Sequence, residues 1–211
     1  MENPVLIFGA KGLGRVALDV FQRNEVLVYG FLDDDTALHN TEISDIPVLG
    51  STDDDGFLKL IGKKCEAFVA IEERSLRRNL VDMLQEKRKS QPVNAIHDTA
   101  LVSALADIGH GNLVGARVAI SATATVGHHN ILQTGAVVEH GAVVGDFVNL
   151  GAGAIVGAEA KLENEVFVGA GAIIVAGVSV GKGASIGAGS VVIENVPKGA
   201  RMFGNPAQKI G

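Results

Sequence analysis

A glycine-rich segment near the start of the chain has the composition of a phosphate-binding turn. It follows the apolar run Val5–Phe8 and precedes a helical pattern. Backbone amides at a helix start, with the positive end of the helix dipole, attract phosphate groups. The glycine spacing is GxxGxG rather than the GxGxxG of dinucleotide-binding domains, so it disfavours NAD. The residues expected to contact a ligand here are Gly9, Lys11, Gly12, Leu13 and Gly14.

Two acidic residues further along the chain add a second polar feature. Asp33 and Asp34 follow the apolar run Val26–Leu32. At the end of such a strand an acidic side chain can accept hydrogen bonds from a ribose or a base. The two features together favour a nucleotide-linked ligand. A simpler interpretation stays open, in which the glycines only form a tight turn and the aspartates only cap a loop.

Histidines supply the other reactive side chains, because imidazole changes its protonation state near neutral pH. The chain has six, and His140 directly follows Glu139, the nearest acid in the sequence. A carboxylate beside an imidazole can orient the ring and stabilise its charged form. The alternative is that His140 is a solvated turn residue.

Composition narrows the classes of protein that could use these groups. The net charge of −6 argues against nucleic-acid binding, because that function needs a basic surface. The sequence shows neither a membrane-spanning apolar stretch nor a signal-peptide pattern. The single cysteine, Cys65, fits a reducing compartment. We therefore expect a cytoplasmic protein that binds neither membranes nor nucleic acid.

The elements that must position these residues fall into two halves. Residues 1–97 carry 7 of the 27 glycines and 28 charged residues, whereas residues 98–211 carry 20 glycines and 14 charged residues. The first half alternates apolar runs with helical patterns, which predicts an α/β domain with a parallel sheet. Beyond the runs already named, helices are expected over Leu13–Arg23, Asp53–Ile61 and Ser75–Lys89, and strands over Ala67–Ile71 and Val93–Ile96.

The second half follows a six-residue repeat. Every sixth residue from Val102 to Val192 is Val, Ile or Leu, and the position four residues after each is Ala, Asn, Val or Ser. Such a hexad forms a short strand and a tight turn, and three hexads close one triangular coil. Residue i therefore stacks on residue i+18. The narrow aliphatic core explains why the chain has only eight Phe, one Tyr and no Trp.

The 18-residue stacking brings other histidines together. His110 and His128 are 18 residues apart, and Asp146 lies another 18 further on. They form either a polar ladder along one edge or a metal site between subunits. Carbonic anhydrases with this repeat bind zinc through three histidines, in a spacing that no histidine pair here reproduces. No metal is therefore expected.

The hexads, followed by Gly204-Asn205-Pro206-Ala207, resemble the hexapeptide-repeat acyltransferases. Val5–Gly14, Gly30–Asp34 and Ala70-Ile71 with Arg77 make the chain similar to the sialic-acid O-acetyltransferase group, which includes N-acetyltransferases of nucleotide-linked 4-amino sugars. The resemblance implies a truncated Rossmann-like domain over residues 1–97 and a left-handed parallel β-helix over 98–196. It further implies a coenzyme A-binding extension over 197–211, and a homotrimer.

The resemblance also implies roles for individual residues. His140 is the general base that takes a proton from the acceptor amine or hydroxyl as it attacks the acetyl thioester, with Glu139 beside it. Acetyl-CoA is the acyl donor, and an amino sugar or sialic-acid-type sugar, linked to a nucleotide, is the acceptor. The residues implied for the donor are Asn149, Ala158, Ala170, Ala188, Gly204, Asn205, Pro206 and Lys209. Those implied for the acceptor are Gly9, Lys11, Gly12, Leu13, Gly14, Asp33, Asp34 and Arg77.

Some positions depart from the family pattern. Leu13 stands where a histidine is usual, and Gly141 stands where an acid commonly follows the catalytic histidine. Gln133 and Asn149 replace an asparagine and a donor-contacting histidine. Leu13, Gly141 and Gln133 motivate an alternative, a non-catalytic nucleotide-sugar-binding or assembly paralogue on the same scaffold. A hexapeptide carbonic anhydrase is a third interpretation.

Overall fold

The structure, a computed structural model, describes residues 3–210 and divides the chain into two compact units, Met1–Asp98 and Thr99–Gly211. The first unit is built on a five-stranded sheet in the order β3-β4-β2-β1-β5. Strand β1 pairs in parallel with β2 and β5, β2 pairs in parallel with β4, and β3 runs antiparallel to β4. The strands are β1 (Val5–Phe8), β2 (Val28–Leu32), β3 (Glu42–Ile43), β4 (Ile46–Gly50) and β5 (Glu66–Val69).

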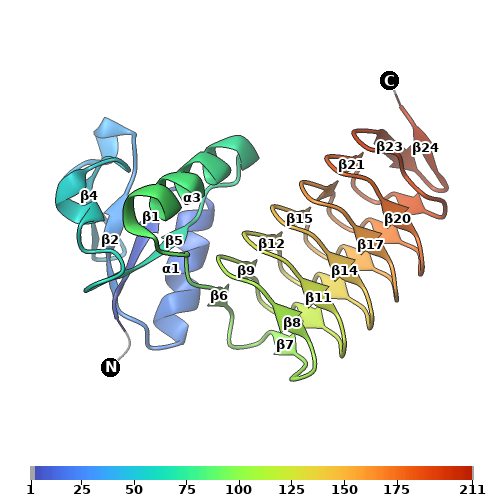
Figure 1. Cartoon of the computed structure of the whole chain (residues 1–211), viewed down its shortest axis with the longest axis horizontal. Helices are drawn as coiled ribbons and strands as arrows, with labels where there is room; N and C mark the ends of the chain where they lie inside the picture. The colour runs from blue at the N-terminus through green and yellow to red at the C-terminus, as the bar shows by residue number, and fades with distance from the viewer. Residues whose placement is uncertain (1–2, 211) are drawn as a thin grey trace. The chain divides into compact units, whose positions relative to one another are not determined.

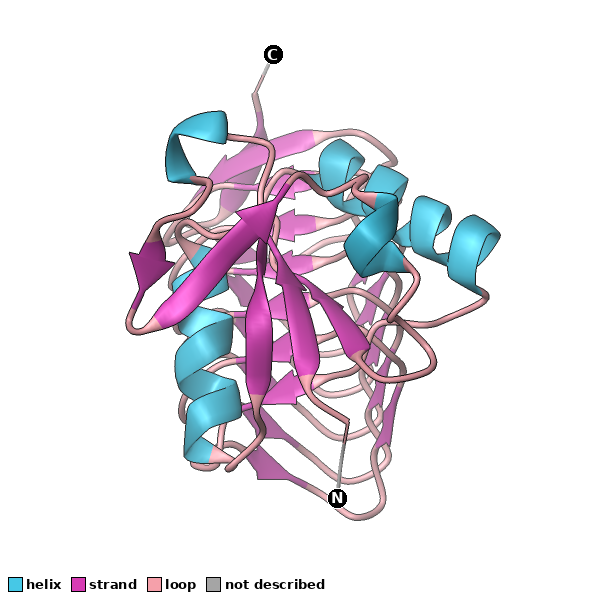
Figure 2. Ribbon diagram, turned by 90° about the vertical axis from the view of Figure 1, so that its left-hand side faces the viewer, coloured by secondary structure: helices cyan, strands magenta, loops and turns pink. Residues whose placement is uncertain are grey.

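Helices flank both sides of this sheet (Figure 2). They are α1 (Leu13–Arg23), α2 (Asp55–Leu58) and α3 (Arg74–Arg88), with a short 3₁₀ helix, η1, over Thr36–Leu38. Helix α1 buries Ala17, Val20 and Phe21, which recur at helical spacing on one face. Glu73 caps the N-terminus of helix α3, and its carboxylate accepts hydrogen bonds from the amides of Ser75 and Leu76.

The first unit differs from the sequence-based expectation in three places. The helix expected over Asp53–Ile61 is only the four residues of α2, because it contains Gly56 and the chain then forms a bridge between Ile61 and Cys65. The β3–β4 hairpin was not predicted. Its turn consists of Ser44 and Asp45, both at positive φ, rather than the Asn-Gly pair that usually marks such turns. Strand β6 (Ala95–Ile96) does not belong to this sheet.

The second unit is a β-helix whose two-residue strands form three parallel sheets (Figure 1). The first face consists of β7 (Leu101–Val102), β10 (Ala119–Ile120), β13 (Val137–Val138), β16 (Ile155–Val156), β19 (Ile173–Ile174) and β22 (Val191–Val192). The second face consists of β8 (Asp107–Ile108), β11 (Thr125–Val126), β14 (Val143–Val144), β17 (Lys161–Leu162) and β20 (Ser179–Val180). The third contains β9 (Leu113–Val114), β12 (Ile131–Leu132), β15 (Asn149–Leu150), β18 (Phe167–Val168), β21 (Ser185–Ile186), β23 (Arg201–Gly204) and β24 (Ala207–Lys209).

Stacking follows the predicted period. Ala119 pairs with Val137, and Val137 pairs in turn with Ile155, so each residue lies beside the one 18 positions later. The second residue of each strand points inward, and the aliphatic column is buried from Val114 to Val192. Val102 is more exposed because the first coil has a neighbouring coil on one side only. Strand β23 extends the third face by pairing with β21 and then turns back antiparallel as β24.

The edges between the faces carry a conformational repeat. From Gly111 to Gly189, every sixth residue has a positive φ, whether it is glycine or not. The non-glycine members are Arg117, Thr123, His129, Phe147, Glu159 and Glu165. Each of these residues lets the chain turn one corner of the triangular coil. Among residues 3–210, no helix is long and apolar enough to cross a membrane.

Candidate active site

The glycine-rich loop joins β1 to α1 and is shaped by close backbone contacts. A Cβ on Gly14 would lie 2.0 Å from the carbonyl oxygen of Gly9, and Gly9 itself has a φ of 99°. Gly12 precedes α1 at a φ of 42°, and no side chain caps the helix. Within the described part of the chain, no acceptor faces the amides of Lys11, Gly12 and Leu13. The loop therefore presents three successive N–H groups at a helix start.

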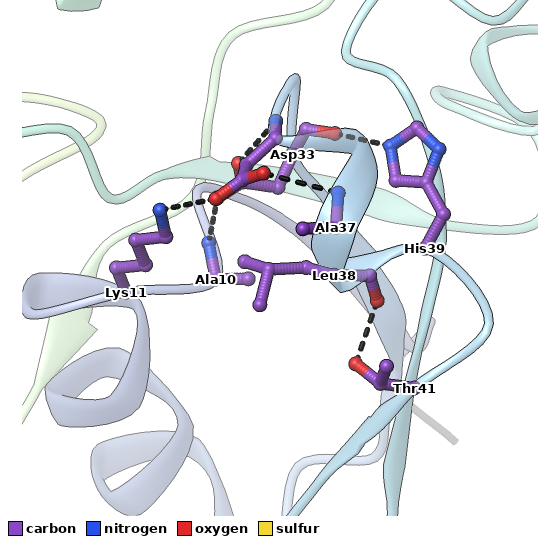
Figure 3. Close-up of polar contacts among 8 residues, drawn as sticks. Ala10, Lys11, Asp33, Ala37, Leu38, His39 and Thr41 are labelled. Atoms are coloured by element: carbon purple, nitrogen blue, oxygen red, sulfur yellow. Dashed lines mark hydrogen bonds and ion pairs between the residues drawn. The ribbon is translucent and has the colours of Figure 1, made fainter.

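Asp33, at the end of β2, is fixed by this loop and by its own turn (Figure 3). One carboxylate oxygen accepts the amide of Ala10 at 2.7 Å, and the other accepts the amide of Asp35 at 2.9 Å. Lys11 Nζ lies 2.5 Å from Asp35 Oδ2. This hydrogen bond raises the pKa of Lys11 and lowers that of Asp35. Asp35 was not among the predicted site residues, although it ends the run of three aspartates.

Asp34 also forms hydrogen bonds with another loop of the protein. Its carboxylate accepts hydrogen bonds from both the amide and the hydroxyl of Thr52, each at 2.9 Å. This contact ties the end of β2 to the segment after β4. Both aspartates thus cap loops, as the simpler interpretation has it, and ligand binding by their remaining lone pairs stays a prediction.

Arg77 lies on α3 and is 1% exposed. Its guanidinium donates hydrogen bonds to the carbonyl oxygens of Ile71 at 2.7 Å and Glu72 at 3.1 Å. Burial lowers the pKa of Arg77 to about 10, so the group stays charged at neutral pH. Arg77 therefore shapes the loop after β5, and Ile71 of that loop crowds the Cβ position of Gly9. Direct contact of Arg77 with an acceptor stays a prediction.

His140 lies on the edge between the first and second faces. Strand β13 of the first face ends at Val138, two residues before it. Its side chain is 66% exposed, and its Nδ1 lies 3.9 Å from Glu139 Oε2. With the carboxylate on its Nδ1 side, the imidazole can offer Nε2 to a reacting group. Ala158, 18 residues further on, occupies the equivalent place on the next coil and adds no bulk there.

The residues predicted for the donor lie along the edges of the β-helix and at its end. Ala170 and Ala188 lie on the edge between the third and first faces, where Gly-Ala-Gly recurs at 151–153, 169–171 and 187–189. A Cβ on Gly153, Gly171 or Gly189 would meet nothing within 4 Å, so the edge is open at these three positions. Gly204, Asn205, Pro206 and Lys209 belong to the β23–β24 hairpin, and Asn149 begins β15 on the third face. No cofactor contact tests these positions, and they stay predictions.

Two other histidines, His110 and His128, belong to a polar ladder on the edge between the second and third faces. The amide of His110 donates to His128 Nδ1 at 3.0 Å, and the amide of His128 donates to Asp146 Oδ1 at 2.8 Å. Asn164 continues the ladder by accepting the amide of Asp146 at 2.9 Å. Each side chain thus binds the backbone one coil earlier. Across residues 3–210, no group of three or more His, Cys, Asp or Glu side chains is arranged to hold a metal ion.

Two family models match the chain, one in each unit. The PglD N-terminal domain matches residues 4–84, and the bacterial transferase hexapeptide model of six repeats matches residues 159–194. No curated protein sequence matches the chain.

Solved structures match both units together. PerB from Caulobacter crescentus, in complex with CoA and GDP-perosamine, is 31% identical with a TM-score of 0.90, over 99% of this chain and 97% of that one. The chain belongs to the hexapeptide-repeat sugar N-acetyltransferases. The acetyltransferase domain of PglB from Neisseria gonorrhoeae, in complex with acetyl coenzyme A, is 25% identical over 100% of both chains, with a TM-score of 0.89. WeeI from Acinetobacter baumannii is 26% identical over 98% of this chain and 99% of that one, with a TM-score of 0.86.

Membership of this sugar N-acetyltransferase family makes the chain an acyltransferase. It also confirms the predicted fold class, a Rossmann-like α/β unit followed by a left-handed β-helix.

Proposed function

We propose that the protein transfers the acetyl group of acetyl-CoA to the amine of a nucleotide-linked amino sugar. The observation that carries this proposal is the match to PerB, which extends over both units and 99% of the chain. PerB was crystallised with CoA and with GDP-perosamine, a nucleotide-linked amino sugar. Because this chain has both units, we propose that it binds both an acyl donor and a sugar acceptor.

The glycine-rich loop is the proposed site for the diphosphate of the acceptor. The free amides of Lys11, Gly12 and Leu13 can donate to phosphate oxygens, and Lys11 Nζ adds a positive charge. The Asp35 carboxylate, whose Oδ2 lies 2.5 Å from Lys11 Nζ, holds that ammonium group in place. A diphosphate therefore meets a cation that is already positioned, and the carboxyl end of the sheet provides room for the base and the sugar.

His140 is the proposed general base. As the sugar nitrogen attacks the thioester carbonyl carbon, His140 Nε2 takes a proton from that nitrogen and a C–N bond forms. The C–S bond then breaks, and the proton passes to the departing thiolate of CoA. Glu139, 3.9 Å from Nδ1, stabilises the imidazolium formed on the way.

The open edge of the β-helix fits the pantetheine arm of the donor. A side chain at Gly153, Gly171 or Gly189 would project into open space, so an extended arm meets no side chain at these positions. The β23–β24 hairpin, with Asn205 and Lys209, ends this edge and provides polar groups for the nucleotide end of CoA.

We propose a homotrimer that forms through the first face of the β-helix. The outward residues of this face are apolar on every coil, namely Leu101, Ala119, Val137, Ile155, Ile173 and Val191. The second face carries the polar residues Asp107, Thr125, Lys161 and Ser179 at the corresponding positions, with Val143 as its one apolar member. Burial of this continuous apolar stripe, which lies beside His140, against a second copy of the chain is more favourable than its exposure to water. We also propose that the protein lies in the cytoplasm, because its single cysteine, Cys65, fits a reducing compartment.

Isothermal titration calorimetry separates this function from the non-catalytic alternative. The protein is titrated with acetyl-CoA and, separately, with UDP-, GDP- and dTDP-linked amino sugars. We expect binding of acetyl-CoA and of one sugar nucleotide, and Lys11→Ala should weaken only the latter, by about tenfold. Binding of a sugar nucleotide without acetyl-CoA would favour the paralogue. Stoichiometric zinc in the purified protein would favour the carbonic anhydrase.

A further inference from the structure

A hydroxyl group lies one coil before the Glu139–His140 pair. Ser121 Oγ donates a hydrogen bond of 3.5 Å to Glu139 Oε2, the same oxygen that lies 3.9 Å from His140 Nδ1. Ser121 and Glu139 are 18 residues apart, and the amide of Ser121 donates to the carbonyl oxygen of Val138 at 2.9 Å. The backbone therefore fixes the hydroxyl beneath the carboxylate.

The serine one coil earlier in the same column makes a different contact. Ser103 Oγ accepts the amide of Leu105 at 3.2 Å and so closes its own turn. Ser121 instead directs its hydroxyl to the next coil. Ser103 and Ser121 thus have the same residue type and the same place in the repeat, and only Ser121 contacts Glu139.

We infer that Ser121 is a positioning residue that holds the Glu139 carboxylate toward His140 Nδ1. This inference rests on the proposed function, in which His140 is the base. A glutamate side chain samples several rotamers when it is partly solvated, and Glu139 is 43% exposed. A hydrogen bond from the adjacent coil favours the rotamer that faces the imidazole. The charge that develops on His140 during proton transfer then meets a carboxylate already in place.

A second carboxylate lies near His140 on the next coil. Glu159, on the following coil, donates its amide to the carbonyl oxygen of His140 at 3.0 Å. Its Cγ lies 3.2 Å from the place that a Cβ on Gly141 would take. The coil neighbours of His140 itself are Ala122 and Ala158, which carry no charge. Glu139 and Glu159 are therefore the two candidates to be separated.

The test compares pH–rate profiles of the full-length enzyme and its variants. Ser121→Ala should lower kcat about fivefold, leave the KM for acetyl-CoA unchanged, and move the acid limb of the profile to lower pH. Glu139→Gln should move the limb in the same direction and further. In the Glu139→Gln background, Ser121→Ala should have no additional effect, because the two act as one unit.

Matched controls decide the assignment. Ser121→Thr retains a hydroxyl and should restore the wild-type profile, and Ser103→Ala should leave it unchanged. Glu159→Gln should not move the acid limb. A Ser121→Ala effect that persists in full in the Glu139→Gln background would overturn the inference, as would a profile that only Glu159→Gln shifts. If the wild-type enzyme transfers no acetyl group, the proposed function fails instead. If His140→Ala keeps full activity, His140 is not the base, and this inference fails with that role.

Discussion

In the α/β unit, Asp33 reaches the amide of Ala10 across 23 positions of sequence, whereas in the β-helix His128 reaches the amide of His110 across 18. The first separation is particular to one loop and one strand end. The second is the period of the coil, and it recurs between Asp146 and His128 and between Asn164 and Asp146. Neighbours in the β-helix can therefore be counted along the sequence, and neighbours in the α/β unit cannot.

The same difference separates the roles of glycine in the two units. Gly14 is required because a Cβ would lie 2.0 Å from a backbone oxygen of another segment of the loop. Gly153 has a positive φ and open space around it, so only the backbone conformation favours glycine there. Glycine is therefore needed at Gly14 because there is no space for a side chain, and it is favoured at Gly153 because of the backbone conformation.

The largest expected effect concerns the histidine on the edge of the β-helix. Replacing His140 with Ala should lower kcat at least about a hundredfold, since it removes the proposed base. The side chain is 66% exposed, so the melting temperature should change little. Steady-state kinetics and thermal unfolding of the same preparation check both statements. Loss of activity that follows loss of folding would assign His140 a structural role.

The next effect tests the two kinds of glycine. Gly14→Ala should destabilise the protein by about 3 kcal/mol, because the new methyl group must displace the Gly9 backbone. Gly153→Ala should cost only about 1 kcal/mol, the strain of a positive φ. Urea unfolding of the two variants measures the difference. Equal losses of unfolding free energy in the two variants would contradict the claim that glycine has different roles in the two units.

A smaller effect compares adjacent valines of one β-helix strand. Val144 points inward and is 1% exposed, whereas its neighbour Val143 points outward and is 39% exposed. Val144→Ala should cost about 2 kcal/mol of unfolding free energy, and Val143→Ala less than about 0.5 kcal/mol. Because residue type and strand are the same, the difference measures the inward column alone. A larger cost for Val143 would contradict the assigned register.

The smallest effect concerns two buried asparagines in the β-helix. Asn112 uses both side-chain polar atoms: it accepts the amide of Asn130 at 2.8 Å and donates to the carbonyl oxygen of Gly127 at 2.9 Å. Asn130 accepts the amide of Val148 at 2.6 Å, but its Nδ2 has no partner among the described residues. Asn112→Ala should therefore cost about 1 kcal/mol more than Asn130→Ala in chemical unfolding. The reverse order would show that the hydrogen bonds of Asn112 and Asn130 do not determine the two unfolding free energies.

These contrasts explain how much the sequence could predict. The hexads identified the β-helix, its register and the ladder from His110 to Asp146, because each depends on counting. The α/β unit was predicted in outline, and the helix Leu13–Arg23 has the expected ends. The β3–β4 hairpin was missed because the turn residues Ser44 and Asp45 carry no strong turn signal. The partners of Asp33 and Asp34 could not be predicted either, since they depend on how separate loops meet.

The most direct test of the account is acetyl transfer itself. The wild-type protein and the His140→Ala variant are incubated with acetyl-CoA and a panel of UDP-, GDP- and dTDP-linked amino sugars. The masses of the products are then measured by mass spectrometry. We expect the wild type to add one acetyl group to the amine of a sugar nucleotide and the variant to leave that amine unmodified. Equal acetylation by the variant would contradict the role of His140, and acetylation of unlinked sugars alone would contradict the role of the α/β unit.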